Sequence, residues 1–446
     1  MIIKTKDRTQ ALARIEDILD PGSFMEIGEH ITAHLTSFYD PGEVTESDGV
    51  ITGYGTVDSH LVFVFSQDAE VMGGTFGEMH GRKIKDLYAR ALKAKAPVIG
   101  IMDCKGFRIE EGLDGLDIFA SLYAMQARAA ERIPQIIAVV GDCGGGMSLS
   151  AVMADFVFIE KEKGNIFVNS QNLVENDLGG SGYISAFDDG RYDWSEIVGN
   201  VQALIRLLPP SADYDPLPAA VTDDLNRPCL AMAEHAGDAR YIIREIADDH
   251  YFFEAQPDKA EDLITGFIRL AGWPVGVVAC NEVDGENRIT SAGCDKATSI
   301  VNLCRKFNLP LLTITDTEGY KTTEENEKYL PNAAGRLIKA LTALTTPKVN
   351  LIVDRVYGSA YSLMNSKGLG ADYVFMWNTA EVSILNPHQA VEMIYGKYDA
   401  ELAAKYEETY TSALALARRG YVDKVIQPED TRKYLIGAFE TFINSK

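Results

Sequence analysis

The sequence predicts an α/β protein that contains two copies of one domain, and three observations lead to this prediction. The segment APVIGIMDCKGF, which starts at Ala96, lines up with LPLLTITDTEGY, which starts at Leu309. Short apolar runs alternate with amphipathic helical periods in both halves of the chain, as in strands that are joined by helices. A proline-rich, acidic segment separates the two halves, as expected of an exposed connector.

The repeat keeps one offset, 213 residues from Ala96 to Leu309, over a long stretch of the chain. In each copy a proline precedes the apolar run, and an aspartate, two residues, a glycine and an aromatic residue follow it. Residues matched without a gap are Lys83 and Lys296, Pro97 and Pro310, Asp103 and Asp316, Gly106 and Gly319, Phe107 and Tyr320, Pro134 and Pro347, and Gly145 and Gly358. Chance similarity does not keep register across several elements, so we interpret the halves as a duplication.

The predicted elements follow in the same order in each copy. In the first copy the apolar run 61–65 predicts a strand, and apolar residues at helical spacing predict a helix over 80–95. Further along, the first copy is expected to have a strand at 98–102, a helix at 118–130 and a strand at 136–140. The second copy is expected to have strands and helices at 275–279, 297–307, 311–315, 337–344 and 349–353.

The connector LLPPSADYDPLPAAVTDDLNRP places the domain boundary near residues 208–228. Prolines and acidic residues at this density suit an exposed linker better than a core element. We therefore expect an N-terminal domain over residues 1–215 and a C-terminal domain over residues 216–446.

The composition argues against several classes of protein. The 446 residues carry a formal net charge of -23, so the chain has no basic field to attract nucleic acid. The start lacks the apolar core of a signal peptide, and no apolar run reaches the roughly 18 residues of a membrane helix. The six cysteines form no CxxC pair and the seven histidines show no metal-ligand spacing. We expect a cytoplasmic protein with reduced thiols and no metal site.

Each copy carries two glycine-containing turns where a predicted strand ends. They are residues 103–107 and 143–147 in the first copy, and 316–320 and 356–360 in the second. Ligands of α/β folds collect at the carboxyl ends of strands, and backbone amides at such turns can hold a developing oxyanion. Tight turns without chemistry are the alternative, but four turns paired within each copy favour a functional role.

Glu110 and Glu111 offer a different chemistry, that of a hydratase with an acid–base carboxylate. Adjacent residues point in different directions, so one of them, Glu111, is expected to face a site and the other water. Cys104 and Cys143 lie in the candidate turns without an evident base, and we interpret them as inert thiols.

Eight segments resemble the carboxyltransferase subunits of biotin-dependent acyl-CoA carboxylases and decarboxylases, such as propionyl-CoA carboxylase beta and methylmalonyl-CoA decarboxylase alpha chains. In chain order they are ALARIEDILDPGSFMEIG, VFVFSQDAEVMGGTFGEMHGRKI, GFRIEEG, PQIIAVVGDCGGG, ITGFIRLAGWPVGVVACN, PKVNLIVDRVYGSAY, TAEVSILNPHQAVEMIY and VDKVIQPEDTRKYLI. The resemblance covers nearly the whole chain. It implies two crotonase-like domains, an N-terminal one for the acyl-CoA and a C-terminal one for biotin, with the site formed between domains of two subunits.

The resemblance also implies roles for the turns. Carried over, the thioester oxygen is held by Gly106, Phe107, Gly145 and Gly146, and the biotin carbonyl by Gly319, Tyr320, Gly358 and Ser359. Gly73 and Gly74 with the cations Arg82, Lys83 and Arg108 are expected to contact the coenzyme A; a solvated helix face is the alternative for each cation.

No biotin-attachment sequence and no ATP-binding loop are present. The resemblance therefore implies biotin on a separate carrier protein, with a biotin carboxylase or membrane decarboxylase subunits as further partners, and a hexamer of this chain. The chain departs from the family pattern at predicted ligand contacts: Lys105, Phe107, Glu318, Ser359 and the segment 386–389. Two alternatives to a carboxyltransferase stay open, a biotin-independent hydratase or isomerase that uses Glu111, and a scaffold subunit with degraded sites.

Overall fold

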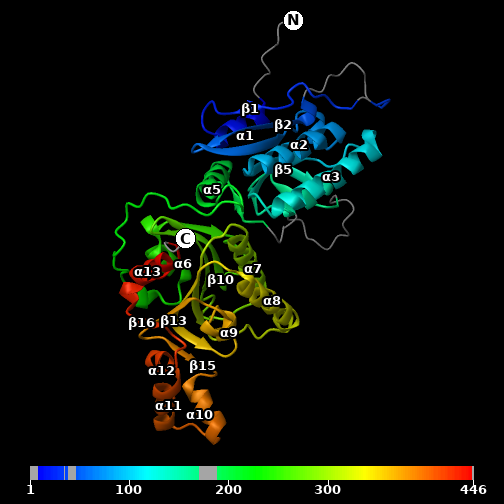
Figure 1. The fold of residues 1–446 in the computed structure, drawn as a ribbon. Coiled ribbons are helices and arrows are strands. Elements are labelled where there is room, and N and C mark those ends of the chain that lie inside the picture. The colour runs from blue at the N-terminus through cyan, green and yellow to red at the C-terminus, as the bar shows by residue number, and fades with distance from the viewer. Residues whose placement is uncertain (1–8, 35, 39–46, 170–187, 444–446) are drawn as a thin grey trace. The chain divides into compact units, whose positions relative to one another are not determined.

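A computed structural model of the chain describes residues 9–34, 36–38, 47–169 and 188–443 (Figure 1). It divides into two compact units, Met1–Tyr214 and Asp215–Lys446, called the first and the second unit below. No helix in these ranges is long and apolar enough to cross a lipid bilayer.

The first unit is built on a sheet in the order β1-β2-β3-β4-β5-β6-β8, with β7 paired to β5. Strands β1 to β3 are antiparallel, and β3, β4, β5, β6 and β8 run parallel. The strands are β1 (Met25–Glu26), β2 (Val50–Val57), β3 (His60–Gln67), β4 (Val98–Cys104), β5 (Gln135–Gly144), β6 (Phe156–Glu160), β7 (Asn165–Phe167) and β8 (Arg191–Tyr192).

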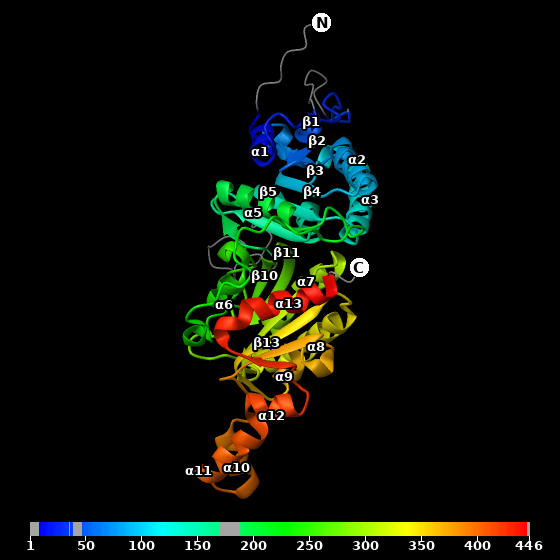
Figure 2. The ribbon, with the colours of Figure 1, turned by 60° about the vertical axis from the view of Figure 1, so that its left-hand side comes forward.

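Helices cover both faces of this sheet, which explains why its central strands are continuous apolar runs. Helices α2 and α3 lie side by side over one face, and α1 and α5 lie over the other (Figures 1 and 2). The helices are α1 (Gln10–Ile18), α2 (Glu78–Ala94), α3 (Leu113–Ala130), α4 (Gly146–Val152) and α5 (Trp194–Leu207), with 3₁₀ turns η1 (Ser47–Gly49), η2 (Met72–Gly74) and η3 (Ile109–Glu111).

The second unit repeats this plan with the sheet β16-β14-β13-β12-β11-β10-β9, in which β15 pairs with β13. Strands β9 to β11 are antiparallel and the rest are parallel. The strands are β9 (Phe252–Ala255), β10 (Leu263–Leu270), β11 (Trp273–Cys280), β12 (Leu311–Thr317), β13 (Lys348–Tyr357), β14 (Tyr373–Trp377), β15 (Glu381–Ser383) and β16 (Lys424–Ile426).

Helices α7 and α8 cover one face of the second sheet, and α6 and α13 cover the other (Figure 2). Helices α10 to α12 project away from this sheet (Figure 1). The helices are α6 (Ala239–Ile246), α7 (Ser291–Lys306), α8 (Glu324–Ala343), α9 (Ala360–Leu363), α10 (Pro387–Tyr395), α11 (Ala400–Tyr406), α12 (Ala413–Arg418) and α13 (Thr431–Ile443). Shorter turns are η5 (Met232–His235), η6 (Asp248–His250), η7 (Lys367–Leu369), η9 (Pro428–Asp430) and the π-helical η8 (Glu407–Thr411).

Every strand and helix expected from the two repeats is present, and the α/β duplication is confirmed. Helix α8 is the one that the sequence placed least well, because it begins at Glu324 rather than near Leu337. Its first half is polar and contains Pro331, so apolar spacing misses it. The cap is local: the Thr323 side chain accepts from the Asn326 amide, and three glutamates occupy the first turn.

Candidate functional site

The two turns of each copy start side by side at the carboxyl ends of adjacent parallel strands. In the first unit Cys104 of β4 is the register partner of Cys143 of β5. In the second unit Thr317 of β12 is the partner of Val356 of β13. We call residues 103–107 and 143–147 the first turn pair, and residues 316–320 and 356–360 the second turn pair.

Within the first turn pair, each turn has a backbone amide without an oxygen acceptor among the described residues. The Gly145 amide donates to the Phe167 carbonyl at 2.9 Å, so it cannot also serve a ligand. The amides for which the described residues provide no oxygen acceptor include those of Phe107 and Gly146. One comes from each turn of the pair, as a carbonyl oxygen that accepts two hydrogen bonds requires.

The backbone around Phe107 is held from outside the turn. The Phe76 amide donates to the Gly106 carbonyl, and the Arg108 amide donates to the Phe76 carbonyl, each at 2.9 Å. Gly106 has a φ of 124°, which side-chain-bearing residues rarely adopt. These constraints place the turn by backbone contacts alone.

The second turn pair repeats this scheme bond for bond. The Gly358 amide donates to the Ser383 carbonyl at 2.9 Å, in the place of Gly145 and Phe167. The Ile289 amide donates to the Gly319 carbonyl, as Phe76 does to Gly106. The amides for which the described ranges provide no oxygen acceptor include those of Tyr320 and Ser359.

The hydrogen bonds distinguish two groups of residues within the turns that the sequence singled out. Gly145 and Gly358 shape their turns, since their amides are already used. The Gly319 amide is also engaged, at 3.2 Å with Thr317 Oγ1. Residue spacing carries no signal that separates a used amide from an unused one.

Two of the residues that depart from the family pattern pack within their own unit. The Phe107 ring lies against Gly115 of α3, where an added Cβ would be 2.6 Å from the ring. The Tyr320 hydroxyl and the Ser359 side chain hydrogen-bond to each other, which links the two turns of the second pair. The third departure, Asn386, caps α10 by accepting from the Gln389 amide at 2.9 Å.

Gly73 and Gly74 have a structural reason to be glycine. Both have positive φ, and a Cβ on Gly74 would lie 2.1 Å from the Asp103 carbonyl oxygen. The Lys105 amide donates to the Gly73 carbonyl at 3.4 Å. The 3₁₀ turn η2 thus packs closely against the first turn pair, and this contact requires small residues.

Two of the three cations predicted to bind coenzyme A phosphates are buried, which corrects that prediction. Lys83 Nζ donates to the Ser47 carbonyl at 3.0 Å and to the Val50 carbonyl at 2.5 Å. Arg108 is 1% exposed and forms ion pairs with Asp48 and Glu111. Neither side chain can reach a phosphate outside the protein. Arg82 is half exposed and pairs with Glu78 at 2.5 Å.

The burial of Arg108 was hidden from the sequence because two of its three partners come from distant segments. Arg108 contacts the Asp48 carboxylate at 2.5 Å, the Glu111 carboxylate at 2.8 Å and the Thr75 carbonyl at 2.8 Å. The remaining Glu111 oxygen accepts from the Glu78 amide at the start of α2. Glu111 therefore does not face a site, and the prediction of an accessible carboxylate base there is wrong.

The same network continues to the strand that carries the first turn pair. The His80 amide donates to Asp48, and the His80 ring bonds to the Asp48 carbonyl and to Gln67. Burial lowers the pKa of His80 to about 3, so the ring is neutral. Gln67 Oε1 accepts from the Asp103 amide at 3.0 Å. A chain of buried polar groups thus connects Asp48, through His80 and Gln67, to Asp103 of the first turn pair.

The second turn pair has a different set of charges. Arg355 is half exposed and contacts Asp354 at 3.3 Å and Glu318 at 3.4 Å. Asp316 is 4% exposed, and burial together with the nearby Asp354 raises its pKa to about 8. Asp316 is therefore a neutral acid near pH 7, a feature that no pattern in the sequence indicates.

Cys104 and Cys143 behave as the inert thiols that we expected. Both are fully buried. Burial raises the pKa of Cys104 to about 11 and raises the pKa of Cys143 well above its usual range. A protonated, buried thiol is a poor nucleophile.

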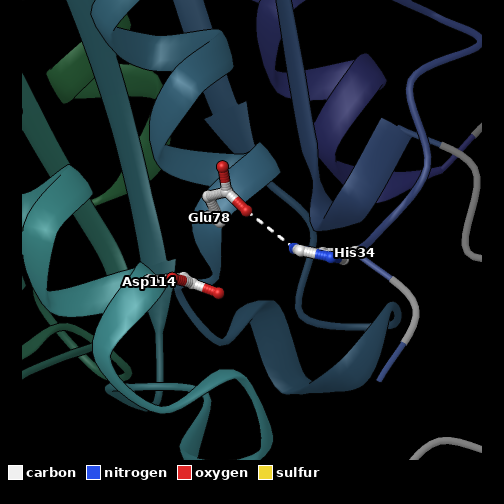
Figure 3. A group of neighbouring side chains, drawn as sticks. All are labelled: His34, Glu78 and Asp114. Atoms are coloured by element: carbon white, nitrogen blue, oxygen red, sulfur yellow. Dashed lines mark hydrogen bonds and ion pairs between the residues drawn. The ribbon is translucent and has the colours of Figure 1, made fainter. Parts of the chain in front are cut away.

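One group of side chains outside the turn pairs has metal-ligand character (Figure 3). His34, Glu78 and Asp114 place ligand atoms within 4.8 Å of one another. His34 Nδ1 lies 2.7 Å from Glu78, which also pairs with Arg82. Glu78 and Asp114 occupy the first turns of α2 and α3, where helix amides attract negative charge. These contacts already account for the cluster, and we assign no metal to it.

Comparison with known proteins identifies the class to which this fold and site belong. The carboxyl transferase domain family matches residues 4–446. The propionyl-CoA carboxylase beta chain of Roseobacter denitrificans is 34% identical over 473 residues, which cover 98% of this chain and 91% of that protein. The methylmalonyl-CoA decarboxylase subunit alpha of Veillonella parvula is 30% identical over 452 residues, which cover 96% of this chain and 89% of that protein.

A solved structure agrees with the sequence comparisons. Transcarboxylase 12S, described as a hexamer assembly with hydrolysed methylmalonyl-coenzyme A bound, superposes with a TM-score of 0.92 at 28% identity. The match covers 98% of this chain and 90% of that one. The chain therefore belongs to the carboxyl transferase domain family, and the expected tandem crotonase-like architecture is confirmed.

Proposed function

We propose that this protein is a carboxyltransferase that moves a carboxyl group between biotin and a short-chain acyl-CoA. The observation that carries the proposal is the repeat of the turn pair in both units, where each of two adjacent strand ends has an amide without an oxygen acceptor among the described residues. Carboxyl transfer involves two carbonyl groups on which negative charge develops, that of the thioester and that of biotin. One protein with two such amide pairs meets this requirement.

On this proposal the first turn pair binds the thioester. The amides of Phe107 and Gly146 donate to its oxygen and stabilise the enolate that forms when the α-carbon loses a proton or a carboxyl group. A protein base is not needed at the α-carbon, which agrees with the burial of Glu111. In the reverse direction the same amides stabilise the enolate left by decarboxylation of a malonyl-type thioester.

On the same proposal the second turn pair binds the ring of biotin, which when bound supplies a nitrogen that carries the carboxyl group. The amides of Tyr320 and Ser359 would hold the ring carbonyl, and their linked side chains keep the two turns together. We propose that biotin arrives on a separate carrier protein, and that a biotin carboxylase or membrane decarboxylase subunits complete the system. All six cysteines are free thiols, which suits a reducing compartment such as the cytoplasm.

We also propose that the chain assembles with itself into a hexamer. Helix α10 exposes Met393, Ile394 and Tyr395, each more than half accessible, and Tyr410 and Leu414 are similarly exposed in the neighbouring turns. Several exposed large apolar side chains on projecting helices are typical of surfaces that bind a partner. Light scattering of the purified protein tests this, and a monomer at micromolar concentration would contradict it.

The function is tested by decarboxylation of malonyl-, methylmalonyl- and glutaconyl-CoA by the purified chain with and without free biotin. We expect product only when biotin is present. Turnover without biotin would favour a hydratase- or isomerase-like enzyme instead. Acyl-CoA binding by calorimetry with no turnover on any substrate would contradict the proposed chemistry, and absence of binding would favour a scaffold subunit.

A further inference from the structure

Asp316 lies at an irregular point of the sheet, directly before the second turn pair. Strands β12 and β13 keep register up to Thr315 and Ile352 and resume at Thr317 and Val356. Asp316 alone therefore lies opposite residues 353–355, which form a bulge in β13. Bulges of this kind redirect the chain beside functional sites. Here the bulge sets the position of residues 356–360.

The Asp316 carboxyl connects three segments that meet at this bulge. It accepts hydrogen bonds from the Arg355 amide and from the Asn287 side chain. Asn287 in turn fixes the following turn, since its carbonyl accepts from the Glu318 amide at 2.7 Å and from the Thr317 hydroxyl at 3.1 Å. One buried carboxyl thus ties β12, the bulge of β13 and the loop before α7 together.

The charges around Asp316 leave it without a dedicated cation. Asp354 and Arg355 face it from β13, and the Cys280 thiol faces it from β11. Arg355 is shared between Asp354 and Glu318, and Glu318 belongs to the second turn pair itself. An anionic Asp316 would compete for this guanidinium and repel Asp354.

We propose that Asp316 is the positioning residue of the second turn pair, because its buried carboxyl lies between the bulge of β13 and the Asn287 loop that holds Glu318. Charge on this carboxyl would loosen the pair. The inference rests on the proposed function, because it assigns the second turn pair to biotin. Ionisation draws Arg355 away from Glu318 and so releases the turn that presents the Tyr320 amide. The counterpart Asp103 lies at the equivalent register shift of the first sheet, and burial raises its pKa as well, but its ion pair with Arg14 at 3.5 Å opposes that rise.

The direct test is the pH profile of kcat/KM for free biotin in the decarboxylation assay. With an acid that titrates near pH 8, the wild type should lose about 30-fold between pH 7 and pH 9.5. Asp316→Asn keeps the hydrogen bonds without the charge and should stay within about threefold over the same range. Asp316→Ala should have a low kcat/KM at every pH. A kcat/KM that is higher in Asp316→Asn than in Asp316→Ala would show that the hydrogen bonds of residue 316 position the turn.

The matched control is Asp103→Asn, the same change at the equivalent position of the first unit. Whatever its effect on rate, it should leave the midpoint of the pH profile unchanged. A profile of Asp316→Asn that falls as steeply as that of the wild type would overturn the inference. So would an equal shift of the midpoint in Asp103→Asn.

A second readout separates this inference from the proposed function. Amide hydrogen exchange at residues 355–360, corrected for the intrinsic effect of pH, should accelerate above pH 8 in the wild type and not in Asp316→Asn. Exchange at residues 142–147 should show no such difference. Absence of biotin-dependent turnover at every pH would defeat the proposed function, and exchange would still decide whether Asp316 braces the turns. Equal exchange in both proteins would overturn that role.

Ionisation of Asp316 also predicts a dependence of stability on pH. The pKa is raised from 3.8 in the unfolded chain to about 8 in the folded protein. The folded state therefore binds more protons than the unfolded state in this window, and stability falls as pH rises through it. Asp316→Asn should have a higher urea midpoint than the wild type at pH 9, and the difference should shrink as the pH is lowered towards 4.

Discussion

The first and second turn pairs share a backbone and its hydrogen bonds, and they differ in the charged side chains around it. In the first unit Arg108 is buried with two carboxylates. In the second unit the equivalent residue by the repeat offset is Lys321, which is partly exposed and pairs with Glu286 at the surface. The duplication therefore kept the amide scheme, while the support below the turns changed from a buried ion network to a neutral acid and surface pairs.

Equivalent positions beside the turns also carry charges of opposite sign in the two units. The first unit has Lys105 and Asp142 where the second has Glu318 and Arg355. The pair Glu318 and Arg355 is an ion pair at 3.4 Å. Divergence of these side chains around a constant backbone is what the proposed binding of two different ligands requires. It teaches that a backbone-built site leaves its side chains free to specialise.

The largest effect that distinguishes the two units is expected from Arg108→Met. This change leaves Asp48 and Glu111 buried without their cation, which should cost about 3–5 kcal/mol of unfolding free energy. Urea unfolding followed by circular dichroism measures it. Lys321→Met is the matched control and should change stability little, because its ion pair is exposed. Equal losses in both variants would show that the two supports are equivalent after all.

The next effect concerns the amide of Ser359. Ser359 has a φ of -70°, which proline can adopt. Ser359→Pro therefore removes one amide, and by analogy with other oxyanion holes kcat should fall about 10²–10³-fold. Ser359→Gly keeps the amide and loses only the hydroxyl, so its kcat should stay within about tenfold of the wild type. Full activity of the proline variant, with an unchanged circular dichroism spectrum, would remove this amide from the site.

The smallest effect is the pH dependence of the unfolding free energy that comes from Lys296, the residue equivalent to Lys83. Lys83 and Lys296 are both buried, and Lys296 Nζ donates to the Lys259 carbonyl at 2.7 Å. Burial lowers the pKa of Lys296 to about 8 from 10.5. The folded state then binds fewer protons than the unfolded state between these pH values, so this group adds stability as pH rises.

The variant Lys296→Met should lack this gain. The difference in unfolding free energy between wild type and variant should grow by about 3 kcal/mol from pH 8 to pH 10.5. Urea unfolding at several pH values measures it. The exposed Lys339→Met is the control and should show a constant difference. A constant difference for Lys296→Met too would mean that this amine is charged and solvated in the folded protein.

The fold was predictable from the sequence because its signals are local and repeated. The strand 98–102 and the helix 80–95 are continuous apolar patterns, and a second copy at a fixed offset confirms each of them. Helix α8 was only half predictable because its first turns bury little. Caps such as Thr323 hold it there, and a cap is a weak signal unless the helix is already known.

The candidate site was predictable only to the level of turns. Gly106 and Gly319 were found because a positive φ favours glycine, and a glycine at the end of an apolar run can be recognised in the sequence. The cations were misassigned because charge alone does not reveal burial. Arg108 meets Asp48 across 60 positions of the chain, and no spacing rule connects residues that far apart.

The sequence by itself determined the duplication, the α/β order of elements, the position of the four turns and the family. Each of these features is indicated by local periodicity or by glycines at positions where the backbone conformation excludes other residues. The tertiary structure alone decided which amides are unused, that Lys83 and Arg108 are internal supports, and that Asp316 is a neutral acid. These properties depend on which carbonyls, carboxylates and solvent surround a group, and packing of distant segments sets those surroundings.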